Sequence, residues 1–418
     1  MTCAVTLCLA AVVAAAVPAA GTPSLEELIE RALVRSPELA AASARVRAAE
    51  ARRVAAGSLE NPMLEVMLQN EGFPDPTIGE AGMSMVGPRL TQTFPGFGVR
   101  SARREVARFE SLERVAEAEL RRRGVIREVR MAYAALYALD QERGALAAAQ
   151  ELLDLLGVAV RQRHAQGLGE SQALSELALR ASTLSERGED LLAERRRVVA
   201  GLQRLCDLPQ SDSFGTILSL PSPARPDSAW GAVALRASAA LLVRRAATEK
   251  IAAELRLWRV EGRPDLTASA GVAFRGGMGP VVTLGIGTDL PLWNGQNRAP
   301  LVRATAEELT ASREDLRDAE ARVREEAQVI MAEWDRADSQ LARYDTERIP
   351  ATRLAFDTAR AAYVNGTLEF PPLLDAFVAW LDTRATRARR EAERFAAFAA
   401  FDYLTRDGAD PMPRVGGE

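Results

Sequence analysis

The chain has 418 residues, of which 26% are charged and only 5% aromatic, and its formal net charge is −4. This balance gives no overall basic field of the kind that binds nucleic acid. The three cysteines and the single histidine, His164, are too few for the usual histidine-based triads and histidine–cysteine metal clusters. We therefore expect no enzyme, no resident metal and no cofactor, although counting residues does not exclude carboxylate chemistry.

Residues 1–20 are an apolar run, rich in alanine and valine, that ends in small residues. Such a run is typical of a secretory signal peptide, although the positively charged start is missing. We expect this signal peptide to be removed; a buried N-terminal helix is the alternative. Beyond it, no uncharged apolar run reaches the roughly 20 residues that a membrane-spanning helix needs, so membrane insertion would have to use β-strands.

The first repeat, 21–208, is predicted to open with helix and continue with two strands. Within 24–57 we expect two helices, because Ser24 and Glu27 form a capping box and Pro37 interrupts the helical pattern. Alternation of apolar and polar residues predicts strands over 62–70 and 83–94, the second interrupted at Pro88.

A long helical hairpin is predicted over 98–208. No proline occurs between residues 98 and 166, and apolar residues recur there at the 4-3-4-3 spacing of a heptad seam. That seam consists of Val125, Val129, Ala132, Leu136 and Leu139. Gly167 and Gly169 break the helix, and the chain is expected to run back antiparallel to it.

The second half repeats the first after a proline-rich linker, 209–226. In the second repeat, 227–405, we expect a helix over 227–261, strands over 264–275 and 281–292, and a helical hairpin over 300–405. Residues 406–418 are expected to be a disordered tail. Val125 and Val323, Pro95 and Pro291, and Gly167 and Gly366 are each about two hundred residues apart, which predicts an internal duplication.

Each repeat contains a strand that breaks at proline and glycine and passes directly into a long helix. These strand-to-helix turns are centred on Pro95, Gly98 and Arg100 in the first repeat and on Pro291, Trp293 and Gly295 in the second. Four strands cannot close a membrane barrel, and an open edge in hydrocarbon leaves costly unpaired backbone groups. Membrane-inserted strands would thus require several chains to share one barrel; the alternative is a small soluble sheet on a coiled coil.

Four segments together resemble, in order and spacing, the TolC-type outer-membrane efflux factors over essentially the whole mature chain. They are residues 25–39, the turn Gln92–Arg100, the turn Leu290–Gly295, and Tyr363–Gly366 followed by Leu373–Ala376. The resemblance implies a mainly α fold with a small β part. It also implies a homotrimer with a shared 12-stranded β-barrel and a periplasmic α-barrel.

The resemblance further implies a non-catalytic exit duct in the bacterial outer membrane with a periplasmic extension. Its partners would be a periplasmic adaptor, an inner-membrane transporter of the RND type and outer-membrane lipid. A drug duct and a type I secretion duct of the same family remain alternatives to a heavy-metal duct. A non-channel periplasmic coiled-coil scaffold is the alternative from outside the family.

Site residues also follow from the resemblance. Asp375 and Glu369 are expected near a channel gate, although Pro372 stands where some members carry an acid; stabilisation of a helix N-terminus is the alternative for Asp375. The hairpin tips expected to contact the adaptor are Gly167, Leu168, Gly169, Asn365, Gly366, Thr367 and Leu368. His164, beside the first tip, is expected to be solvated rather than a ligand.

Methionines gather in or beside the predicted strands. They are Met63, Met67, Met83, Met85 and Met278. Thioethers bind soft ions such as Cu(I), but methionine also fills apolar surface without any ligand. The segment from Asn70 to Met85 resembles the heavy-metal branch of the family more than the drug branch.

Overall fold

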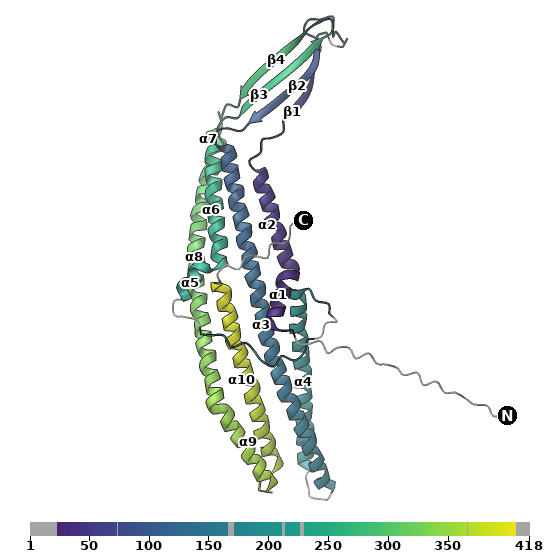
Figure 1. The fold of residues 1–418 in the computed structure, drawn as a ribbon, viewed down its shortest axis with the longest axis vertical. Coiled ribbons are helices and arrows are strands. Elements are labelled where there is room, and N and C mark those ends of the chain that lie inside the picture. Colours follow the sequence, from purple (N-terminus) through teal and green to yellow (C-terminus); the bar gives the residue numbers. More distant parts are fainter. Residues whose placement is uncertain are drawn as a thin grey trace, which may run out of the picture. The chain divides into compact units, whose positions relative to one another are not determined.

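The structure is a computed structural model that describes residues 23–72, 74–165, 171–210, 214–225, 230–365 and 367–406. It consists mostly of helices, together with one four-stranded antiparallel sheet (Figure 1). This confirms the predicted mainly α class with a small β part. The expected signal peptide and, apart from Arg406, the expected tail lie outside the described residues.

The elements follow the chain in the order helices, two strands, helices, two strands, helices. The helices are α1 (Leu25–Arg35), α2 (Pro37–Ala55), α3 (Val99–Ala165), α4 (Ser171–Cys206), α5 (Trp230–Ala237), α6 (Ala239–Val260), α7 (Asn294–Asn297), α8 (Ala299–Arg343), α9 (Ile349–Val364) and α10 (Phe370–Thr405). A π-helical turn, η1 (Tyr344–Arg348), joins α8 to α9. The strands are β1 (Met63–Gln69), β2 (Met85–Phe94), β3 (Leu266–Arg275) and β4 (Met278–Thr288).

The sheet has the order β1-β2-β3-β4, so each strand pairs with its neighbour in sequence. Between Val86 and Arg89 the β2–β3 ladder is interrupted at Gly87 and Pro88, as Pro88 predicts. A Cβ atom on Gly87 would lie 1.9 Å from the carbonyl oxygen of Val272, so only glycine fits this close approach.

The bounds of β4 differ from the predicted 281–292. It begins at Met278 because the β3–β4 turn is only two residues long and uses Gly276, whose φ is +68°. It ends at Thr288 because Pro291 has no N–H to donate and the Leu292 N–H turns back to the Leu290 carbonyl, 2.8 Å away.

Two breaks within the helices depart from the predicted continuous segments. The helix expected over 227–261 is divided at Ser238, where φ and ψ are −56° and 119°. Ser36 divides α1 from α2 with nearly the same angles, −57° and 120°, and both serines are buried. The other break, η1, precedes Pro350, whose ring and missing N–H disfavour a regular α-helical turn.

The chain forms two compact units, and each unit draws on both halves of the sequence. Within the described residues, the hairpin unit comprises 23–31 and those of Ala132–Pro221 and Leu341–Ala392. The sheet unit comprises the described residues of Ala32–Met131 and Ser222–Gln340, together with 393–406. The two predicted repeats therefore do not correspond to the two compact units, since each unit contains segments of both repeats. The internal duplication stays a prediction.

Each unit has its own apolar core. In the hairpin unit, Leu153 and Val160 of α3 pack with Leu177 of α4 and Leu374 of α10. In α8, apolar residues at the same 4-3-4-3 spacing are buried throughout, at Val323, Ala327, Ile330, Trp334 and Ala337. Full burial of each large aliphatic side chain contributes about 1.5–3 kcal/mol to the free energy of folding, and this burial stabilises the long helices.

None of the described helices combines the length and the apolar composition that crossing a bilayer requires.

Candidate functional site

One face of the sheet is apolar and exposed. The register aligns Leu64 with Leu90, Leu90 with Ala270, and Ala270 with Leu284, so these residues share a face. The large side chains of this apolar face are Leu64, Val66, Leu68, Val86, Leu90, Phe94, Leu266, Val272, Phe274, Val282, Leu284 and Ile286. Leu284 and Ile286 are 79% and 84% exposed. An exposed apolar surface of this extent marks an interaction with protein or membrane.

The opposite face is mostly polar. Alternation along the strands gives it Glu65, Gln69, Arg89, Thr91, Thr93, Thr267, Ser269, Arg275 and Thr283. The outer strands, β1 and β4, each have only one partner strand within the described chain. The sheet thus has two chemically different faces and two edges with backbone groups free to pair.

The first strand-to-helix turn is held by backbone and side-chain hydrogen bonds. Pro95 follows the end of β2, and Gly98, with φ of +89°, precedes α3. The Gly96 N–H donates to Oδ1 of Asp265 at 2.8 Å. Arg100 donates through Nε and Nη2 to the carbonyl of Gly57, at 3.1 and 2.8 Å. The residues predicted here therefore position the turn against the segments that precede β1 and β3.

The second turn is less direct than predicted. Pro291 and Trp293 lie between β4 and the short helix α7, which contains Gly295, and only then does α8 begin. Asn294, which the sequence did not single out, donates from Nδ2 to the Gly262 carbonyl at 2.8 Å. Trp293 is 65% exposed, beside the exposed Leu290 and Leu292. This turn therefore presents apolar side chains to its surroundings.

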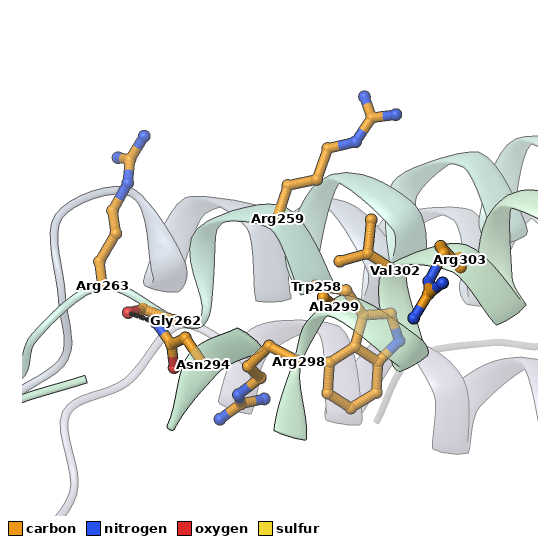
Figure 2. A pocket seen from close by; sticks show the side chains of 9 residues that line it. All are labelled: Trp258, Arg259, Gly262, Arg263, Asn294, Arg298, Ala299, Val302 and Arg303. Carbon is orange, nitrogen blue, oxygen red and sulfur yellow. Dashed lines mark hydrogen bonds between the residues drawn. The ribbon is translucent and has the colours of Figure 1, made fainter. Parts of the chain in front are cut away.

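A cavity of about 500 Å³ adjoins the second turn (Figure 2). We call it the arginine–tryptophan cavity. It is lined by Trp258, Arg259, Gly262, Arg263, Asn294, Arg298, Ala299, Val302 and Arg303. The Arg298 guanidinium carbon lies 5.6 Å from the centre of the Trp258 ring and so makes a cation–π contact. The sequence pattern did not predict that these arginines lie close together, because they come from separate segments of the chain.

At the second hairpin tip, the described part of the turn is closed by hydrogen bonds. The N–H groups of Asn365 and Thr367 donate to the carbonyls of Ala361 and Ala362, at 3.1 and 2.9 Å. Leu368 is half-buried, and Glu369 is exposed just before α10. Gly366, the first tip (Gly167, Leu168 and Gly169) and the side chain of His164 lie outside the described part of the structure.

Asp375 lies within α10 and accepts a hydrogen bond from Nη2 of Arg180, on α4, at 3.1 Å. The helix begins at Phe370 and has no acidic residue in its first turn, so Asp375 does not stabilise the helix N-terminus. Both partners are exposed, and the pair therefore contributes about 0–1 kcal/mol. Sequence reasoning missed Arg180, which is distant in the chain.

Glu142 forms a second link between the same two helices. It accepts hydrogen bonds from Arg187 on α4, at 2.5 Å, and from Arg389 on α10. Burial alone would raise the pKa of Glu142, but the hydrogen bonds from Arg389 and Arg187 outweigh burial and hold this pKa below its ordinary value. These three residues also line a cavity of about 360 Å³ between α3, α4 and α10.

The Glu142 link is expected to weaken in acid. A carboxylate whose pKa is lower in the folded than in the unfolded chain stabilises the fold above its unfolded pKa, and this stabilisation is lost as pH falls through the folded pKa. At neutral pH, Glu142→Gln should destabilise by about 1 kcal/mol, a value reduced because both arginines are well exposed. Thermal unfolding should show a smaller difference in stability between Glu142→Gln and the unmodified protein at about pH 3 than at pH 7.

Glu254 serves as a control because its pKa is shifted in the opposite direction: burial raises it. Its charge opposes folding above the raised pKa, so Glu254→Gln should not destabilise the protein at pH 7. A Glu142→Gln penalty that stays constant with pH would contradict the assigned role.

No group of three or more histidine, cysteine, aspartate or glutamate side chains suited to a metal ion occurs among the described residues.

Comparison with known proteins finds one matching family and several solved structures with a similar fold. The sequence profile of the outer membrane efflux protein family matches residues 28–207. A search of curated proteins finds no match. The fold is similar to that of the outer-membrane channel OprN, with a TM-score of 0.79 and 17% identity over 93% of this chain and 91% of that chain.

Two further solved structures share the fold. The outer membrane protein VceC of Vibrio cholerae matches with a TM-score of 0.76 and 17% identity, over 91% of this chain and 95% of that chain. CusC, studied for folding and transmembrane channel formation, matches with a TM-score of 0.75 and 15% identity, over 92% of each chain. Residues 28–207 thus match the outer membrane efflux protein family, and the chain has the fold of the outer-membrane channels, which confirms its resemblance to the TolC-type efflux factors.

Proposed function

We propose that this protein is the outer-membrane exit duct of a tripartite efflux system. The observation that carries the proposal is the sheet, with one exposed apolar face, one polar face and two open edges. In lipid, such a sheet is stable only if its edges are paired, because unpaired backbone groups cost several kcal/mol each. The apolar face then contacts lipid and the polar face lines water.

The edges pair most simply in a homotrimer. Four strands from each of three chains give a shared 12-stranded barrel, in which β1 of one chain pairs with β4 of the next. The long hairpins extend from it into the periplasm as an α-barrel. OprN and CusC, which share the fold, are described as a channel and as forming a transmembrane channel.

The proposed duct is passive and needs no catalytic group, because an inner-membrane transporter, of the RND type, supplies the energy. The tips at 165–171 and 365–368 contact a periplasmic adaptor. Asp375 and Glu369 lie near the closed entrance, where three copies of each would disfavour anions. The exposed ion pair between Arg180 and Asp375 links the second hairpin weakly to the first.

The methionines favour soft metal ions as cargo. Met63 and Met67 alternate with the apolar residues of β1, and Met85 pairs with Gln69, so all three lie on the polar face. If these methionines only filled apolar surface, they would belong on the apolar face, and there they are absent from the described strands. Thioethers bind Cu(I) and similar soft ions. A drug duct and a type I secretion duct are the competing assignments.

A deletion strain tests this proposal. We expect it to be sensitive to copper and related metals but not to dyes or antibiotics. The intact gene should restore growth, whereas a gene lacking the tip 165–171 should not, because the adaptor would no longer dock. Immunoblots should show both proteins in the outer-membrane fraction as trimers, which separates loss of docking from loss of folding.

Sensitivity to dyes and antibiotics would identify a drug exporter and contradict the methionine argument. Soluble monomers, found away from the outer membrane, would overturn the duct itself and favour a coiled-coil scaffold.

A further inference from the structure

The arginine–tryptophan cavity carries an unbalanced positive charge. Four of its nine lining residues are arginines, and none is acidic. Arg298 pairs with Glu261 at 3.2 Å, but Glu261 also pairs with Arg103 at 3.1 Å, so one carboxylate is shared by two guanidinium groups. A surface hollow lined by one sign of charge attracts ions of the opposite sign.

Two of the arginines have guanidinium groups available to a ligand. Arg263 donates to the Phe97 carbonyl at 2.5 Å and is therefore engaged in the first strand-to-helix turn. Arg259 and Arg303, both exposed, make no hydrogen bond or ion pair with any residue that the structure describes. In Figure 2, Arg298 and Arg303 lie on either side of the Trp258 ring, while Arg259 extends away from the helices. Guanidinium groups bind phosphate oxygens in bidentate fashion.

The surroundings of the cavity distinguish a lipid from a free anion. Leu290, Leu292 and Trp293 directly precede the cavity residue Asn294 and are 71%, 72% and 65% exposed. A free phosphate ion would gain nothing from contact with these apolar side chains, whereas the acyl chains of a lipid would pack against them. Tryptophan and arginine together are typical of the level of the membrane headgroups.

We propose that the arginine–tryptophan cavity binds the phosphate of an anionic phospholipid headgroup, with Arg303 as the free donor beside the Trp258 ring and the exposed Arg259 as a second free arginine of the lining. The inference rests on the proposed function, because only a membrane-inserted sheet brings its helix-proximal end to the headgroups. The bound lipid fixes the depth of the sheet in the membrane, at the boundary between β4 and α8.

Native mass spectrometry of the full-length protein in a neutral detergent tests this assignment. Phosphatidylglycerol and phosphatidylcholine with the same acyl chains are added separately, and the bound fraction of each is measured. We expect phosphatidylglycerol to be retained in preference. The double variant Arg259→Gln/Arg303→Gln should weaken its retention by about tenfold, since each neutralised guanidinium removes a charge-assisted contact.

The matched control is Arg244→Gln/Arg313→Gln. It removes two exposed arginines from the same helices, α6 and α8, that do not line the cavity. It changes the net charge equally and should leave retention unchanged. Equal loss in both double variants, or equal retention of the two lipids by the unmodified protein, would overturn the inference.

An excess of inorganic phosphate distinguishes the two sources of the phosphate group. Phosphatidylglycerol that stays bound supports the lipid, while its displacement by inorganic phosphate shows a free-anion site and overturns the lipid assignment. The same sample is inserted into planar bilayers. Trimers that conduct but show no lipid preference overturn only this inference, whereas the absence of trimers and conductance overturns the proposed function as well.

Discussion

Replacing Leu284 by arginine is expected to abolish assembly of the protein in the outer membrane. Leu284 lies near the middle of β4, on the apolar face, and is 79% exposed. Arginine on the lipid-facing side of a membrane β-strand costs about 2–4 kcal/mol near the bilayer midplane. In a trimer this penalty occurs three times. The measurement is the amount of heat-dissociable trimer in the outer-membrane fraction, compared on gels with and without heating.

The matched control is Thr283→Arg, which introduces the same side chain at the adjacent residue. Thr283 pairs with Gly271 on the polar face, so its side chain is predicted to face water in the duct. This variant should assemble normally and resist heat as the unmodified protein does. Equal assembly of the two variants would contradict the assignment of the faces. Failure of Thr283→Arg alone would show that the faces are reversed.

Replacing Asp140 by alanine is expected to cause the largest loss of stability in the hairpin unit. Its carboxylate is fully buried and accepts hydrogen bonds from Nε of Arg195 at 2.7 Å and from the Ile217 N–H at 2.9 Å. Arg195 in turn donates to the carbonyls of Phe214 and Gly215. Removing one partner of a buried ion pair costs about 3–5 kcal/mol, because the remaining charge loses its counter-charge.

The Asp140 variant should also release the segment from Phe214 to Ile217. We expect chymotrypsin to cut after Phe214 or Leu218 faster in Asp140→Ala than in the unmodified protein, together with a lower unfolding temperature. Asp140→Asn keeps one acceptor oxygen for Ile217 and should lose about half as much stability. Asp375→Ala, which breaks an exposed pair with Arg180 in the same unit, should change it by at most about 1 kcal/mol. Unchanged cleavage in Asp140→Ala would contradict this account.

The elements that were predicted well are those whose periodicity is read from many residues. The predicted seam of α3 recurs at heptad spacing, and Val125, Val129 and Leu136 are buried, while Ala132 and Leu139 are half-buried. Strand β1 lies within its predicted range, because Leu64, Val66 and Leu68 alternate with polar or less apolar neighbours. The strand-to-helix turns could be located because proline and glycine mark them directly.

The features that were missed depend on single residues or on distant partners. The helix breaks at Ser238 although no proline is there, and the five-residue π-helical turn η1 produces no periodic pattern in the sequence. Arg180 and Glu142 acquire their roles only when α4 is placed beside α10, far away in the chain. The arginine–tryptophan cavity likewise joins the end of α6 to the start of α8, so neither segment predicts it alone.

The interleaving of the two units decides when the chain can fold. The hairpin unit is incomplete without residues 341–392, and the sheet unit is incomplete without the residues after Glu393. The ion pair of Arg130 forms only with Asp402, and the hydrogen bond of Tyr137 only with Glu391, and both partners lie far along the chain. Contacts between residues so distant in sequence form slowly, because loop closure must come first. Neither core can therefore be completed until these late segments of the chain are available.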